Sequence, residues 1–419
     1  MNSNVENFKN NEFKEQCSEY TFTPFIYPKV KRIVVFGDIH GDYEMIIKLF
    51  QMSNLARIVN ERKITRTRIN TLKINSSPHK KSSKSSKSSK SKKSKKNKYG
   101  GVNDNDISIK ETISEEEIEY EMEWIGNDTF VVQVGDQIDR CRPNETYTCD
   151  HPKAIQEGDE DSDTKILKLF TNLHEQAVKA GGAVISLLGN HELLNALGEV
   201  QYVSFKGLKN ILKKYKIEGL DFDNGLEARK HAFKPGNEYG KFLGCTRNAT
   251  VIIGSNLFVH AGIIDSLVNQ FKFTGYVDVE HVNILIKKWL LGLIQTNKVS
   301  SLVRSQDSMF WTRVLGSIPA GVPVDYPSCS DNISNVLKLF NVDKMIIGHT
   351  PQSFLFNKDI NGTCGDKIWR VDNGSSSAFN MFDENYKKYK QIHPNRRLQY
   401  LEIIDDTEYH VYDESGRVF

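Results

Sequence analysis

Short apolar runs that end in a glycine recur along this chain, and the polar residues that follow them are suited to metal chemistry. The run VVQV (131–134) leads into Gly135, after which Asp136, Asp139 and Arg140 follow within five positions. In α/β proteins, ligands and reacting groups lie at strand ends of this kind. The same pattern occurs in IVVFGDIHGD (33–42), VISLLGNHE (184–192), LFVHAG (257–262) and MIIGHT (345–350). Together these loops predict a metal centre around Asp136.

Carboxylate and imidazole groups, with a single amide oxygen, make up the metal ligands that these loops offer. Such a set suits divalent Mn, Fe or Zn. Asp136 has two carboxylate oxygens, so it is able to bridge two metals about 3.5–4 Å apart. A single Asp in such a loop is as often a turn residue as a ligand, and a single His after a strand is more often structural. Several of them near glycines at strand ends favour a metal site. The candidate ligands are Asp38, His40, Asp136, Asn190, His260 and His349.

The surrounding pattern supplies the elements that must position these loops. Apolar runs alternate with helical periodicity in the first part of the chain, and apolar runs predominate later. Asp42 is predicted to cap a helix that begins at Tyr43 and ends near Leu55. Another helix is expected over about 164–180, and a hairpin over about 397–412. This order of elements indicates one large α/β domain with layered sheets.

Five motifs in order, GDIHG, GDQIDR, GNHE, VHAG and GHT, resemble those of the metal-dependent phosphoprotein phosphatases in the calcineurin-like phosphoesterase superfamily. The stretches GNHELLNALGEVQYVS, FWTR and WRVDNGSSS are most similar to the Shewanella-like, bacterial-type branch. The resemblance covers about 29–60 and 124–380. It implies an α/β fold, the calcineurin-like metallophosphatase β-sandwich of two mixed sheets flanked by helices, with the metals at the strand ends.

The resemblance also implies a role for each matching residue. Two divalent metal ions (Mn, Fe or Zn) would be bound by the six candidate ligands. Asp38, His40 and Asp136 would bind the first metal, and Asp136, Asn190, His260 and His349 would bind the second.

Four further residues are implied to act on the substrate. His191 would be the general acid, and Asp139 would orient it. Arg140, and Arg313 of the FWTR motif, would bind the phosphate. The family usually has glycine where this chain has Cys141, and VHGG where this chain has VHAG. Both differences leave every candidate ligand in place.

Composition and charge restrict the class of protein. The 419 residues carry a formal net charge of +3, so the chain as a whole has no signature of nucleic-acid or membrane binding. The N-terminal sequence lacks the apolar stretch of a secretory signal, and the most apolar helical stretch, near 284–294, is too short to cross a bilayer. The six cysteines lack metal-type CxxC spacing, which is interpreted as free thiols in a reducing compartment. We therefore expect a soluble intracellular protein, in the cytoplasm and without a membrane partner.

Residues 61–118 differ from the rest of the chain in composition. They contain HKKSSKSSKSSKSKKSKKNK and lead into the acidic EEEIEYEME. Such a segment buries too little apolar surface to offset chain entropy, so a low-complexity, disordered insertion is predicted. We expect a solvated spacer, although its basic run could instead bind nucleic acid or act as a localisation signal. The predicted organisation is an N-terminal arm (1–28), one metallophosphatase domain (29–60 and 119–415) and this insertion.

The combined features predict a metal-dependent phosphomonoesterase, of the protein phosphatase type, that uses a hydroxide activated by two metals. Its substrate would be a phosphoprotein or a phosphorylated small molecule. One alternative is a nucleotide phosphohydrolase of the diadenosine tetraphosphatase type, which shares much of the motif set. Another is a catalytically silent phosphate-binding module, which the presence of all the ligands with His191 and Arg140 disfavours. No covalent nucleophile is required, so none of the cysteines is expected to be catalytic.

Overall fold

The computed structural model describes residues 3–73, 108–154, 158–159, 161–355, 357, 359–383 and 396–418. The chain divides into two compact units. The larger unit comprises Met1–Ile58 and Met122–Phe419, and the smaller unit comprises Val59–Glu121. All of the predicted site residues belong to the larger unit.

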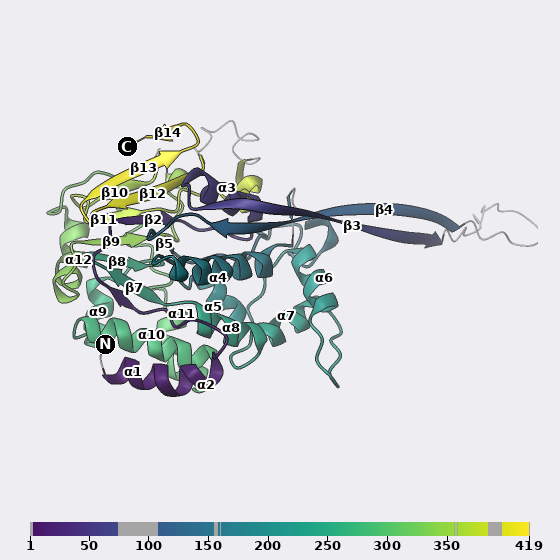
Figure 1. Ribbon diagram of the computed structural model, residues 1–419, viewed down its shortest axis with the longest axis horizontal. Helices are drawn as coiled ribbons and strands as arrows, with labels where there is room; N and C mark the ends of the chain where they lie inside the picture. Colours follow the sequence, from purple (N-terminus) through teal and green to yellow (C-terminus); the bar gives the residue numbers. More distant parts are fainter. Residues whose placement is uncertain are drawn as a thin grey trace, which may run out of the picture. The chain divides into compact units, whose positions relative to one another are not determined.

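Two six-stranded sheets form the centre of the larger unit (Figure 1). Both are mixed: β2 and β5 are parallel while β12 and β2 are antiparallel, and β8 and β9 are parallel while β7 and β8 are antiparallel. In order across the first sheet, the strands are β14 (Gly416–Arg417), β13 (Glu408–Asp413), β12 (Gln399–Ile404), β2 (Arg32–Phe36), β5 (Phe130–Gln133) and β6 (Ala183–Ser186). Across the second they are β1 (Ile26–Tyr27), β7 (Thr250–Ile253), β8 (Asn256–Val259), β9 (Lys344–Ile347), β11 (Ile368–Arg370) and β10 (Asn361–Thr363).

Apolar side chains from both sheets form one buried cluster between them. Val35 and Val132 come from the first sheet, and Phe258 and Ile346 come from the second. The neighbouring strands β5 and β6 are buried along their whole length, because helices cover the outer face of the sheet as well. The predicted β-sandwich of two mixed sheets flanked by helices is therefore confirmed.

Helices pack on the outside of each sheet. Phe36 of β2 contacts Phe50 of α3, and Phe50 in turn contacts Phe170 of α4. Asp42 Oδ1 accepts a hydrogen bond from Met45 N at 3.1 Å, so the predicted N-cap is confirmed. The helices of this region are α3 (Tyr43–Met52), α4 (Asp163–Lys179), α5 (Asn190–Ala196), α6 (Phe205–Lys214), α7 (Gly225–Phe233), α8 (Glu238–Thr246), α9 (Asp265–Phe271), α10 (Tyr276–Leu290), α11 (Ser300–Arg304) and α12 (Pro327–Leu339). The 3-10 turns are η2 (Pro152–Ala154), η3 (Thr296–Lys298), η4 (Gln352–Leu355) and η5 (Ser377–Phe379).

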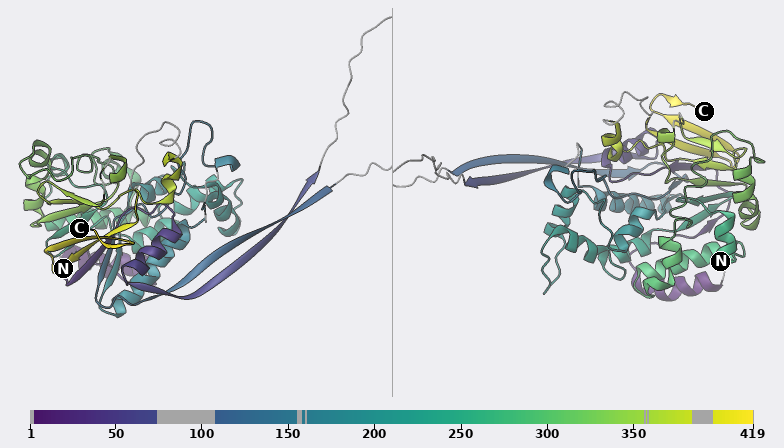
Figure 2. Two further views of the ribbon diagram at one scale, coloured as in Figure 1. Left: turned by 90° about the horizontal axis from the view of Figure 1, so that it is seen from above. Right: turned by 180° about the vertical axis from the view of Figure 1, so that it is seen from behind.

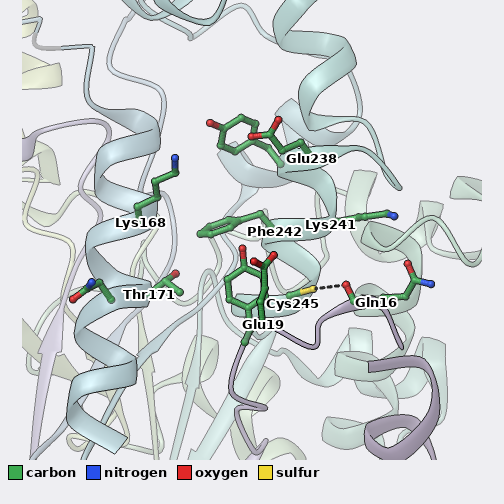
Figure 3. A pocket seen from close by; sticks show the side chains of 11 residues that line it. Gln16, Glu19, Lys168, Thr171, Glu238, Lys241, Phe242 and Cys245 are labelled. Atoms are coloured by element: carbon green, nitrogen blue, oxygen red, sulfur yellow. Dashed lines mark hydrogen bonds between the residues drawn. The ribbon is translucent and has the colours of Figure 1, made fainter. Parts of the chain in front are cut away.

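The N-terminal arm is helical and packs against the rest of the larger unit. It consists of α1 (Ser3–Phe8), a π-helical turn η1 (Lys9–Phe13) and α2 (Lys14–Gln16). Phe8 and Phe13 are buried in a cluster with Leu291. Where the arm passes α4 and α8 there is a pocket of about 540 Å³, into which Phe242 projects toward the helix that carries Lys168 and Thr171 (Figure 3).

The smaller unit contains most of a two-stranded sheet, which is formed by β3 (Ala56–Lys73) and β4 (Ser108–Trp124). The two strands run in opposite directions (Figure 2). The structure thus differs from the prediction at the two ends of the insertion, 61–73 and 108–118, which it places in these strands. Residues 74–107 lie outside the described residues, so the prediction of disorder there stays a prediction. Every helix in the described part of the chain is too short or too polar to span a bilayer.

The prediction of free thiols is wrong, because the six cysteines form three disulfides: Cys17–Cys245, Cys141–Cys149 and Cys329–Cys364. Two of these pairs join residues 228 and 35 positions apart. Sequence spacing could not reveal them, because only folding brings such residues together. The argument from free thiols to a reducing compartment therefore does not hold.

We expect the unfolded, unreduced chain to show no reactive thiols and the reduced chain to show six, as measured with a thiol reagent. In the chain-entropy account, a disulfide stabilises more when it closes a longer loop. Replacing Cys17 and Cys245 by Ser should therefore lower the free energy of unfolding by about 3–5 kcal/mol. Replacing Cys141 and Cys149, which are only 8 positions apart, should cost less. Reactive thiols in the unreduced chain would contradict the pairing.

Candidate metal centre

Parallel strands bring the predicted ligands to one edge of each sheet. In the first sheet, β2, β5 and β6 are parallel neighbours, and the loops after them carry Asp38, Asp136 and Asn190. In the second sheet, β8 and β9 are parallel, and His260 and His349 follow them. These five side chains and that of His40 are all buried. The structure therefore brings together the ligands predicted from five separate loops.

Asp136 lies between two groups of these side chains. On one side, His40 Nε2 is 3.8 Å from Asp136 Oδ2 and 3.9 Å from Asp38 Oδ2. On the other side, His260 Nε2 is 3.4 Å from Asp136 Oδ2, and the rings of His260 and His349 are 5.0 Å apart. These nitrogen–oxygen distances exceed normal hydrogen-bond lengths. They suit atoms that converge on a shared ion.

Two sets of three side chains each place their donor atoms within 4.8 Å of one another. The first set is His40, Asp136 and His191, and the second is Asp136, His260 and His349. Asp136 is common to both sets. Asn190 Oδ1 lies 3.0 Å from His260 Nε2, beside the second set. The Asp38 carboxylate accepts hydrogen bonds from the backbone N–H of His349 at 3.1 and 3.2 Å, which links the two sheets.

Hydrogen bonds orient two of the imidazoles for ligation. His260 Nδ1 is 2.8 Å from Val134 O, and His349 Nε2 is 3.0 Å from Trp311 O. A carbonyl oxygen only accepts, so in each ring that nitrogen carries the proton and the other nitrogen has a free lone pair. Metal-binding histidines usually donate their second N–H in this way. The donor chemistry of the site therefore fits a divalent metal.

The charges of the clustered side chains also favour a divalent metal at this site. Burial raises the pKa of Asp38 well above its usual value, and the carboxylates of Asp372 and Asp136 raise it further. Burial alone would also raise the pKa of Asp136, but the imidazoles of His260 and His191 hold it well below the usual value. Burial lowers the pKa of His40 well below normal, which keeps that imidazole neutral. Burial lowers the pKa of His260, but the Asp136 carboxylate raises it above its ordinary value. Buried carboxylates such as Asp38 and Asp136 need compensating positive charge, which divalent cations would supply.

Four residues of the site have a left-handed backbone conformation. The φ angles of His40, Asp136, Asp139 and His349 are 48°, 55°, 73° and 66°, a region that non-glycine residues rarely adopt. Each such residue costs roughly 1–3 kcal/mol and persists only where its surroundings fix it. Strain of this kind clusters at functional sites.

Two glycines allow the backbone to approach the ligand carboxylates. A Cβ atom at Gly189 would lie 2.2 Å from Asp136 Oδ1, and one at Gly348 would lie 2.3 Å from Asp38 Oδ1. Any side chain at these positions would displace a candidate ligand. The glycines that marked the loops in the sequence are thus required by close packing at the site.

A chain of buried polar groups holds His191. Its Nδ1 is 2.8 Å from Asp139 Oδ2, and Asn195 Nδ2 donates to both oxygens of Asp139 at 2.9 and 3.0 Å. Asn195 Oδ1 accepts from Arg229 Nε at 2.7 Å, and Arg229 Nη2 donates to Asp163 Oδ2 at 2.9 Å. These bonds fix the ring of His191, whose Nε2 lies 4.0 Å from Asp136 Oδ2.

Comparison with known proteins identifies the family to which a chain with this arrangement belongs. Residues 106–353, more than half of the chain, match the calcineurin-like phosphoesterase family. The chain belongs to this family. It is 34% identical over 255 residues to an uncharacterized protein of Acanthamoeba polyphaga mimivirus, a match that covers 58% of this chain and 96% of that protein.

Two further similarities agree with the predicted branch. The chain is 29% identical over 287 residues to Shewanella-like protein phosphatase 2 of Arabidopsis thaliana, which covers 61% of this chain and 64% of that protein. It therefore spans slightly less than two-thirds of that relative. A solved structure of a cold-active protein tyrosine phosphatase shares the fold, with a TM-score of 0.52 at 16% identity over 97% of this chain and 84% of that chain. The resemblance to the Shewanella-like branch is confirmed.

Glu192 joins two motifs of this phosphoesterase site. Its Oε2 accepts hydrogen bonds from the backbone N–H of Gly189 at 2.7 Å and of Asp136 at 3.0 Å, and its Oε1 accepts from Gln137 N at 2.8 Å. Burial raises its pKa, with a further contribution from the Asp136 carboxylate. Glu192 therefore holds the loop after β5 against the start of α5.

The two predicted phosphate-binding arginines lie in different surroundings. Arg313 Nη1 donates to His349 O at 2.9 Å, beside the second set of ligands. Arg140 Nη2 donates to Gly158 O at 2.8 Å, and its Nη1 is 3.3 Å from Asp42 Oδ2. Arg140 also lines a pocket of about 330 Å³, and none of the candidate metal ligands is among the described residues that line it.

The sequence analysis did not identify Glu192, Asn195, Arg229 or Asp372 as site residues. A signal existed for Asn195, because it lies four positions after His191 on α5 and so on the same helix face. Glu192 lies within the quoted GNHE motif, and Asp372 lies within WRVDNG. Arg229 has no local signal, because it comes from α7 and reaches Asn195 only through tertiary packing.

We expect Asn195→Ala to lower kcat by about 10–100-fold, as loss of a supporting group around a metal site typically does. Asp139 would lose two hydrogen bonds and His191 its fixed orientation. Stability should fall by about 1–3 kcal/mol, because Arg229 Nε is left without this acceptor. Phosphatase kinetics, metal content and urea unfolding measure these effects. Asn283→Ala is a matched control, since Asn283 is also buried but bonds to the backbone of Ala249 and Thr250; it should lose stability and keep its kcat. An unchanged kcat in Asn195→Ala would contradict the role of this chain of bonds.

Proposed function

We propose that this chain is a phosphomonoesterase of the protein phosphatase type that works with two divalent metal ions. The observation that carries the proposal is that Asp136 is common to two sets of donor atoms, one shared with His40 and His191 and the other with His260 and His349. Asp139 fixes the His191 ring at this place. Membership of a metal-dependent phosphoesterase family supports the reaction class. The printed name of the Arabidopsis relative supports a phosphoprotein as substrate.

Asp38, His40 and Asp136 would bind one metal, and Asp136, Asn190, His260 and His349 the other. When bound, such metals activate water for attack on phosphorus and neutralise charge on the phosphate. The shared carboxylate of Asp136 would set their spacing, and its low pKa keeps it ionised and able to bind on both sides. The identity of the metals is proposed as Mn, Fe or Zn from the mixed oxygen and nitrogen donors.

His191 would protonate the leaving oxygen of the substrate. Asp139 Oδ2 accepts the hydrogen bond of Nδ1, which leaves Nε2 to face the site. A positioned general acid contributes about 10²–10⁴ in rate. Arg313 would bind the phosphate beside His349, because a guanidinium offers paired donors to two phosphate oxygens. The sequence-based role of Arg140 in phosphate binding stays a prediction.

The proposal is tested with chelator-treated protein, Mn, Fe or Zn added back, and a panel of substrates. We expect metal-dependent release of phosphate from phosphoserine, phosphothreonine or phosphotyrosine peptides. Asp136→Asn should lose more activity and more bound metal than Asp38→Asn, because Asp136 alone lies between both donor sets. A preference for diadenosine tetraphosphate over every phosphopeptide would contradict the protein phosphatase assignment. Full activity of Asp136→Asn with unchanged metal content would contradict the two-metal site.

We expect His191→Asn to lower kcat by about 10²–10⁴ on substrates with poor leaving groups, because they need the proton. The loss should be much smaller on an activated aryl phosphate, whose leaving oxygen scarcely needs protonation. Steady-state kinetics on an alkyl phosphate and on an aryl phosphate measure the difference, with metal content as the control. Equal losses on both substrates would remove His191 from the role of general acid.

A further inference from the structure

Arg142 lies beside the candidate metal centre, although it belongs to none of the motifs that identified the site. Its guanidinium carbon is 4.8 Å from the centre of the Phe379 ring and 5.8 Å from the centre of the Tyr202 ring. The Phe379 ring is 5.2 Å from that of His40, and the Tyr202 ring is 4.9 Å from that of His191. The cation is thus held by two aromatic side chains that each border a site imidazole.

Backbone carbonyls fix one end of this guanidinium. Arg142 Nη1 donates to Asp139 O and to Cys141 O, both at 2.9 Å. Cys141 is itself fixed, because it is bonded to Cys149 and its N–H donates to Tyr202 O at 3.0 Å. Among the described residues, no hydrogen bond is recorded for Nε or Nη2 of Arg142. Its two remaining donor groups form the fork with which arginine binds two oxygens of a phosphate.

A fixed cation at this place favours an anionic ligand. The Arg142 guanidinium contacts two aromatic rings that border His40 and His191, so its positive charge lies next to the donor groups of the site. Positive charge beside a site that is built to hold metal cations is unfavourable unless an anion lies between them. A phosphoryl group supplies that anion. Arg313 occupies the corresponding place on the other side of the site, next to His349.

Arg140, in contrast, is turned toward Asp42 and Gly158. Its guanidinium therefore pairs with groups outside the two donor sets. A second arginine, Arg142, follows two positions further on. The Cys141–Cys149 disulfide and the hydrogen bond from Cys141 N–H to Tyr202 O hold the Arg142 backbone next to the site.

We propose that Arg142 binds the phosphoryl group of the substrate, with its Nε and Nη2 donating to two phosphate oxygens. This inference rests on the proposed function. Arg142 and Arg313 then hold the phosphate from opposite sides of the metal centre, and Arg140 stabilises the loop through Asp42. The aromatic rings of Phe379 and Tyr202 keep the Arg142 guanidinium in place before the substrate arrives.

The test titrates inorganic phosphate into the metal-loaded full chain by calorimetry and measures kcat/KM on an aryl phosphate. We expect Arg142→Ala to weaken phosphate binding at least about 10-fold and to lower kcat/KM by about 10²-fold, as loss of one charged donor to a transition state does. Bound metal should be unchanged. Arg142→Lys keeps the charge but not the fork, so it should fall between Arg142→Ala and the unaltered chain. If Arg142→Ala does not fold, the Arg142→Lys variant is used for the test in its place.

Two controls make the result specific. Arg304→Ala removes an arginine that pairs with Glu199 on the surface, and it should bind phosphate as the unaltered chain does. Arg140→Ala should weaken phosphate binding less than Arg142→Ala. The proposal is overturned if Arg142→Ala or Arg142→Lys binds phosphate as the unaltered chain does, if Arg140→Ala has the larger effect, or if the unaltered chain binds no phosphate. Phosphate binding that depends on Arg142, without hydrolysis of any monoester, would overturn the proposed function and leave this inference standing.

Discussion

The buried carboxylate of Asp136 is the constraint on which the rest of this structure depends. It lies between two sets of donor atoms, and the imidazoles around it keep it charged in a place where burial would favour the neutral acid. Several acidic groups share this small volume, and burial raises the pKa of Asp38 and brings that of Asp372 to about 6. Such a concentration of buried acid calls for matching positive charge, which the metals of the proposed function would supply.

Much of the local geometry follows from bringing these groups together. Parallel strands end at one edge of each sheet, and Asp38 ties the two sheets by accepting the N–H of His349. Glycines at 189 and 348 let backbone pass within van der Waals distance of the carboxylates. Left-handed backbone at His40 and Asp136 turns each loop sharply after its strand. The two packed sheets offset this local strain with a large buried apolar cluster.

Around this centre, polar groups from distant elements set the orientation of His191, the proposed general acid. The chain from His191 through Asp139 and Asn195 to Arg229 joins α5 to α7, and Glu192 joins α5 to the loop after β5. Buried bonds of this type are strong because few competing waters reach them. The Cys141–Cys149 disulfide adds a covalent link on the same side, and it is there that Arg142 enters the site.

The sequence by itself determined the fold class and the loops that carry the candidate ligands, because strand periodicity, glycine positions and Asp, His and Asn types are all local properties. Tertiary structure decided the rest. The pairing of Cys17 with Cys245, the reach of Arg229 to Asn195 and the direction of the Arg140 side chain depend on groups far apart in the chain. The strands that continue into 61–73 and 108–118 likewise depend on pairing with each other, which composition does not report. Local patterns specify elements and residue types, whereas contacts between distant segments exist only once the chain has folded.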